Sequence, residues 1–105
     1  MKNFFLVFLL SFLLIGKSHA WTLKGALAHS CGRLLTAHEN KWQSHMDIYK
    51  QGALGFITAM NFVLNTDAAS GIDEDSIYYD VLNYCRKEPL KDVFDAAFNT
   101  YQKLK

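Results

Sequence analysis

Apolar side chains recur at intervals of three or four residues along most of this chain. Such spacing places them on one face of an α-helix, whereas a half-buried strand would need strict alternation. Four helical stretches follow one another, and no alternating run of useful length competes with them. The pattern therefore predicts an all-α domain, a single small bundle of four main helices.

The first two predicted helices are separated by the polar run 39–41. The first spans about residues 22–38. The second is longer, and its apolar positions are Trp42, Met46, Tyr49, Ala53, Phe56 or Ile57, Met60, and Val63 or Leu64. Gly52, Gly55 and Ala59 lie on or beside this stripe. Because glycine inside a helix costs about 1 kcal/mol relative to alanine, the pair indicates a close approach of two helices or a kink. We expect a tightly packed groove in the core there rather than a ligand site.

The last two predicted helices follow a loop at residues 65–71, which is rich in Asn, Thr, Asp, Ser and Gly. Asp73 is suited to cap the third helix, with Glu74 and Asp75 in its first turn. Pro89 suits the first position of the fourth helix. Its expected apolar stripe is Leu90, Val93, Phe94, Ala97, Tyr101 and Leu104.

The segment 1–20 has the layout of a cleaved secretory signal peptide. Lys2 supplies a positive start, residues 4–15 are apolar except for Ser11, and small residues occupy positions 18 and 20. Twelve residues are too few to cross a bilayer, which takes about 20, although a short membrane anchor is the alternative. We expect cleavage before Trp21, a mature domain at 21–105 and a location in the periplasm.

Export changes the meaning of the two cysteines, Cys31 and Cys85. In an oxidising compartment an even pair favours a disulfide over two free thiols. Closing a loop of about 55 residues would restrict the unfolded chain by about 4 kcal/mol on the loop-entropy account. We therefore predict a disulfide that joins the first helix to the end of the third.

Charge and motifs exclude several classes of function. Beyond residue 20 the chain has nine Lys and Arg against ten Asp and Glu, a net charge of about −1 without a basic cluster, which argues against nucleic acid as a partner. No nucleophile elbow, phosphate-binding glycine loop or zinc motif is present. The spacing of His29, His38 and His45 favours surface or helix-end positions over a metal site. We expect a non-enzymatic protein that needs no cofactor or metal and contacts no membrane after cleavage.

Carboxylates gather near the start of the third helix. Five of the ten lie within 67–80, and we single out Asp73, Glu74, Asp75 and Asp80 as candidate pH-responsive groups. They are either a solvated loop with a well-capped helix or an acid-sensitive patch. If all ten carboxylates were protonated, the mature chain would carry about +12, and repulsion of that size loosens compact states.

Several motifs resemble those of the HdeA/HdeB group of periplasmic acid-stress chaperones. They are SCGRLL at 30–35, GALGFI at 52–57, GID at 71–73, YCRKEPL at 84–90 and DAA at 95–97. The resemblance implies an all-helical protein that contains a disulfide and is a homodimer near neutral pH. In acid such proteins open and hold unfolding client proteins through apolar surface. Phe56, Ile57, Met60 and Val63 are the candidate dimer or client surface.

A second group is similar in outline. Periplasmic immunity proteins against toxins of type VI secretion are also small, exported, helical and disulfide-bonded, with a Gly-aromatic-Ile segment like Gly55-Phe56-Ile57. They usually contain further cysteines, which this chain lacks. That resemblance implies one cognate toxin as partner, held by an aromatic or charged anchor.

Overall fold

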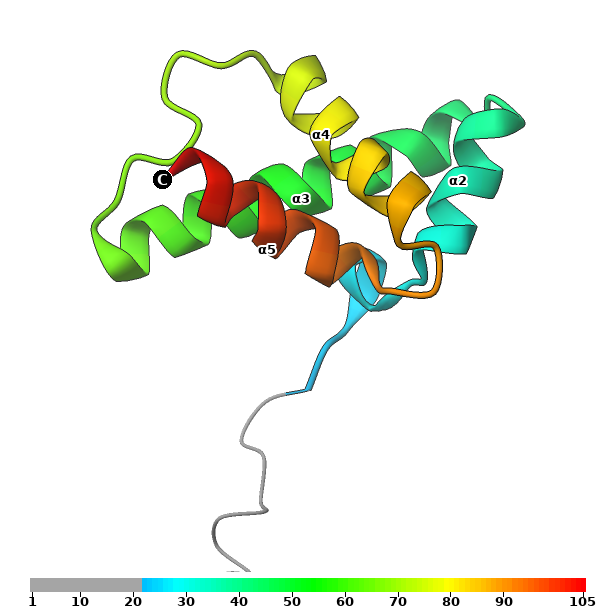
Figure 1. Cartoon of the computed structure of the whole chain (residues 1–105), viewed down its shortest axis with the longest axis horizontal. Helices are drawn as coiled ribbons and strands as arrows, with labels where there is room; N and C mark the ends of the chain where they lie inside the picture. Colours follow the sequence, from blue (N-terminus) through cyan, green and yellow to red (C-terminus); the bar gives the residue numbers. More distant parts are fainter. Residues whose placement is uncertain (1–21) are drawn as a thin grey trace, which may run out of the picture.

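Residues 22–105, the part of the chain that the computed structural model describes, form one short 3-10 helix and four α-helices (Figure 1). The predicted signal peptide lies outside this range. The elements are η1 (Gly25–Ala28), α2 (Cys31–Glu39), α3 (Gln43–Leu64), α4 (Glu74–Lys87) and α5 (Val93–Leu104). Within residues 22–105 the only strand-like pairing is an isolated bridge between Ser30 and Asp92. The predicted all-α bundle of four main helices is confirmed.

Helix α3 runs through the length of the bundle, and the other elements pack against it (Figure 1). Helix α2 lies beside the first turns of α3, while α4 and α5 pack against each other and against α3. The loop after α3 passes the end of α5 on its way to α4, where the amide of Ala69 donates to the carbonyl of Leu104.

The first predicted helix, 22–38, is wrong in its extent. Gly25 has a φ of +74°, and His29 and Ser30 are extended, so the chain forms only the short η1 before α2 begins. The Ser30 hydroxyl accepts from the backbone N–H of Arg33 and caps α2. A serine cap thus divides a stretch whose apolar spacing indicated one helix.

The fourth helix begins later than Pro89 indicated. Helix α4 does end before the proline, at Lys87, but residues 89–92 form a turn and bridge. Asp92 caps α5, and the Asp95 carboxylate accepts from the Asp92 N–H in a capping box. Leu90 is consequently 97% exposed rather than part of the apolar stripe.

Two clusters of buried side chains make up the core. The disulfide cluster surrounds Cys31 and Cys85, which are bonded with their Cα atoms 4.9 Å apart, as predicted. Its other fully buried members include Leu34, Leu82 and Val93. The Tyr101 cluster consists of Ile57, Ala68, Ile77 and Tyr101, and it is covered in part by Leu54, Phe56, Met60 and Ala69.

No helix within residues 22–105 combines the length and apolar character that crossing a bilayer requires.

Candidate functional site

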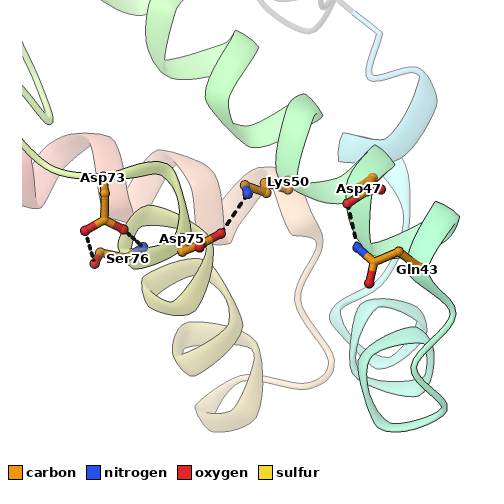
Figure 2. Close-up of polar contacts among 6 residues, drawn as sticks. All are labelled: Gln43, Asp47, Lys50, Asp73, Asp75 and Ser76. Atoms are coloured by element: carbon orange, nitrogen blue, oxygen red, sulfur yellow. Dashed lines mark hydrogen bonds and ion pairs between the residues drawn. The ribbon is translucent and has the colours of Figure 1, made fainter.

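The candidate carboxylates on α4 point in different directions instead of forming one patch. Asp73 caps its own helix and accepts from both the backbone N–H and the hydroxyl of Ser76, at 2.8 and 2.9 Å (Figure 2). Asp75 reaches across to α3 and pairs with Lys50 at 2.7 Å (Figure 2). The Glu74 carboxylate makes no hydrogen bond or ion pair with any described residue. The hydrogen bond with Asp75 is the main cause of the raised pKa of Lys50, and the charge of Glu74 adds to it.

Asp80 faces α5 and binds two of its side chains. The carboxylate accepts from the Thr100 hydroxyl at 2.6 Å and forms an ion pair with Lys103. Partial burial raises the pKa of Asp80, but the hydrogen bonds from Lys103 and Thr100 outweigh it and leave that pKa below its usual value. Thr100 is itself fully buried, so this contact joins the inner face of α5 to α4.

Asp73 and Asp80 are therefore acid-sensitive supports of the fold. The hydrogen bonds from Ser76 lower the pKa of Asp73, as those from α5 lower the pKa of Asp80. A carboxyl whose folded pKa is depressed stabilises the fold above its unfolded pKa, which is about 3.9 for aspartate. The stabilisation is lost as the pH falls through the folded pKa.

The four candidate apolar residues of α3 fall into three environments. Ile57 is only 4% exposed and belongs to the core, so it contributes nothing to the surface of the folded chain. Met60 and Phe56 are half-buried, and the Phe56 ring lies edge-on against Phe94 with centroids 5.3 Å apart. Val63 is 73% exposed and is the one clear surface residue among them.

The apolar surface is wider than those four positions. At 100° per residue, seven residues of α3 from Ile48 onward fall in one arc of about 120°. They are Ile48, Gly52, Gly55, Phe56, Ala59, Phe62 and Val63, and we call them the α3 flank. Ser44 and His45, in the first turn of α3, continue the same arc. None of the seven is polar, and no charged residue occurs anywhere in 51–66. Phe62 is 88% exposed and Ile48 57%.

Gly52 and Gly55, both expected to form a tight core groove, differ in their surroundings. A Cβ placed on Gly52 would lie 3.4 Å from the Cβ of Ala26, so η1 approaches the helix closely there. A Cβ on Gly55 would meet nothing within 4 Å. Gly52 thus lies against η1 at a contact distance that a small side chain could also make, whereas Gly55 is open on the surface of the α3 flank.

Two of the histidines are held by buried tyrosines, which spacing alone did not indicate. His29 Nδ1 lies 2.7 Å from the hydroxyl of Tyr49, and His38 Nδ1 lies 3.1 Å from that of Tyr78. Burial raises the pKa of both tyrosines, so the two hydroxyls stay protonated. Among residues 22–105 no group of three or more His, Cys, Asp or Glu side chains is placed to hold a metal ion.

No family model matches this chain, and searches of the curated proteins and of the solved structures likewise find no match.

Proposed function

We propose that this chain is an exported, non-enzymatic binding protein, an acid-stress holdase that prevents aggregation of unfolding clients in the periplasm. The observation that carries the proposal is the α3 flank, an uncharged and largely exposed face in the middle of the longest helix. Exposed helix faces of globular proteins normally bear charged residues. A contiguous apolar face is typical of a surface that binds another protein.

The flank suits apolar segments of an unfolding protein. Covering a side chain as exposed as Phe62 contributes about 1.5–3 kcal/mol. Phe56 and the half-exposed Phe98 of α5 extend the apolar surface beyond α3, with ring centroids 6.4 Å apart. Contacts of this kind depend on buried apolar area rather than on direction, so they favour a broad range of clients over one sequence.

Acid enlarges this surface. Protonation of Asp75 and Asp80 breaks the ion pairs that hold α4 to α3 and α5, and protonation of Asp73 removes the cap of α4. The mature chain meanwhile approaches a charge of about +12, which adds general repulsion. The disulfide is insensitive to pH and keeps α2 and α4 joined. The Tyr101 cluster is therefore the part of the core that acid exposes.

Near neutral pH we propose that a second copy of the chain covers the α3 flank. Ile48 and Phe62 stand seven residues before and after Gly55. A two-fold axis over Gly55 would lay two α3 helices antiparallel, with Ile48 of each copy facing Phe62 of the other. Interfaces with two-fold symmetry require such self-complementarity, and the open glycine permits close approach.

The experiment compares two exposed apolar residues that differ only in location. Phe62→Ser removes an aromatic ring from the α3 flank, whereas Leu90→Ser changes an equally exposed residue in the turn before α5. Serine is uncharged at every pH used, so the charge of the protein is the same. Aggregation of an acid-denatured client is followed by light scattering at pH 2.5, and the association state by sedimentation at pH 7.

We expect wild type and Leu90→Ser to suppress aggregation at pH 2.5 and to sediment as dimers at pH 7. Phe62→Ser should suppress client aggregation less, and its dimer should dissociate at a higher protein concentration than that of wild type. A wild-type protein that stays compact in acid and protects no client would refute the holdase. Tight binding of one partner by that rigid form would favour the immunity role instead.

A further inference from the structure

A groove with cationic and aromatic walls lies between α2 and the beginning of α3. Its volume is about 410 Å³, and Arg33, Thr36, Trp42, His45 and Tyr49 are among its lining residues. Small-molecule sites in proteins usually have volumes of about 300–1,000 Å³. The groove is separate from the Tyr101 cluster and from the carboxylate contacts of α4.

The groove carries positive charge without a negative partner. Arg33 is exposed, and its guanidinium makes no hydrogen bond or ion pair with any residue in 22–105. No Asp or Glu lines the groove, and the side chains of Trp42 and His45 add ring nitrogens to the guanidinium of Arg33. The positive charge of Arg33 also reaches Tyr49, where burial raises the tyrosine pKa and Arg33 opposes that rise.

The aromatic wall has a polar edge and an open face. Trp42 is 49% exposed, and its ring lies beside that of His45 with centroids 5.5 Å apart. Tyr49 is only 4% exposed and its hydroxyl is already paired with His29, so it is not free to bind a ligand. The indole N–H and the guanidinium offer donors only. A matching ligand therefore has to supply acceptors.

We propose that this groove binds an oxyanion, a carboxylate or phosphate, carried on a flat apolar body. The planar guanidinium of Arg33 pairs with two oxygens of such a group. The flat body stacks on the Trp42 indole. The proposal is independent of client binding by the α3 flank.

Four probes distinguish the contribution of the negative charge to binding from that of the flat body: benzoate, phenyl phosphate, inorganic phosphate and neutral benzamide. Each is titrated at pH 7 into the oxidised, ¹⁵N-labelled mature protein, and the shifts of the Trp42 indole N–H and the amides of residues 32–36 are followed. Benzoate or phenyl phosphate should give saturable shifts confined to the groove. The one that binds more tightly identifies the preferred head group.

Arg33→Gln is the decisive variant, and Arg86→Gln is its matched control. Arg86 is an exposed arginine on α4 whose side chain is bound only to Asn83, and it is not among the residues that line the groove. We expect Arg33→Gln to weaken the binding of the aromatic anions at least about tenfold, with Arg86→Gln unchanged. Trp42→Ala should weaken benzoate but not inorganic phosphate.

Three results would overturn the proposal. Equal shifts with benzamide would show that charge is not recognised. Equal losses in Arg33→Gln and Arg86→Gln would show attraction to net charge alone. Shifts that spread over the surface without saturation would show that no site exists. None of these results changes client protection at pH 2.5. The proposal for the groove can therefore fail while the proposal for the α3 flank stands.

Discussion

The disulfide cluster and the Tyr101 cluster are closed by different kinds of interaction. The first is held by a covalent bond between α2 and α4 and by apolar residues that are wholly excluded from solvent. The second is closed by polar contacts: the Tyr101 hydroxyl lies 2.7 Å from that of Thr66. Nearby, the Asp80 carboxylate holds Thr100 and Lys103. The disulfide cluster also includes Tyr49 and Tyr78, which contact His29 and His38, but its covalent bond does not depend on pH. The Tyr101 cluster has no such bond to hold it when the carboxylates lose their charge.

On the proposed function, this difference would let a protein of this size open without unfolding completely. Helix α4 crosses both halves, with Ile77 near one end and Cys85 near the other. In that proposal, acid releases the end of α4 that carries the carboxylates, while the disulfide retains the other end. Helix α3, which also spans both clusters, then presents its flank next to newly exposed core.

Removing the disulfide should give the largest loss of stability. Replacing Cys31 and Cys85 together by serine frees a loop of about 55 residues, and we expect about 4 kcal/mol less free energy of unfolding. Urea titration at pH 7 measures the difference. A loss below about 1 kcal/mol would mean that the apolar residues of this half suffice without the bond.

Tyr101→Phe tests the hydrogen bond between Tyr101 and Thr66 at the edge of the Tyr101 cluster. The ring stays buried, but Thr66 loses its hydroxyl partner, so we expect a loss of about 1 kcal/mol in the free energy of unfolding. The Thr66 hydroxyl also donates to Asn61, which limits the loss. The same urea titration applies, and an unchanged midpoint would show that this hydrogen bond does not hold the Tyr101 cluster together.

Gly55→Ala should raise the stability of the isolated chain. The new Cβ meets no atom within 4 Å, and alanine restricts the unfolded chain, so we expect a gain of about 0.7 kcal/mol. Dimerisation at pH 7 should weaken at the same time, as seen by sedimentation. A variant that is more stable and dimerises equally well would exclude Gly55 from the interface.

Asp80→Asn should have a small effect at pH 7 and a clear effect on pH dependence. The lowered pKa of Asp80 means that its contribution is present above about pH 4 and lost in stronger acid. Because the carboxylate is partly exposed, we expect about 0.5 kcal/mol at pH 7, with wild type and variant converging near pH 2. Asp67→Asn, on the exposed loop, is the control. Parallel stability curves for wild type and Asp80→Asn would contradict this role.

Local rules predicted the parts of the fold that local interactions determine. The polar break at 39–41, the long α3 and the Asp73 cap follow from neighbouring residues alone. The positions at which α2 and α5 begin depend instead on contacts between the two segments. The amide of Cys31 donates to the carbonyl of Lys91, and the amide of Val93 donates to that of His29. Contacts between residues so far apart cannot be read from apolar spacing.

The candidate site was predicted in part for the same reason. The sequence shows that carboxylates are numerous near α4. It does not show that Asp75 forms an ion pair with Lys50, or Asp80 with Lys103. The apolar stripe of α3 identifies the side that faces the core. Ile48 and Phe62 lie outside that stripe, and only their spacing of seven residues from Gly55 could have indicated a second apolar face.

The division of α4 between two halves is the central claim, and amide hydrogen exchange on the oxidised protein tests it most directly. Exchange at pH 3 is compared with exchange at pH 7 after correction for the intrinsic rates. We predict that residues 74–80 of α4 and 98–104 of α5 lose protection at pH 3, while residues 81–87 of α4 and 31–39 of α2 keep it. Protection that is lost, or kept, uniformly along α4 would contradict the account.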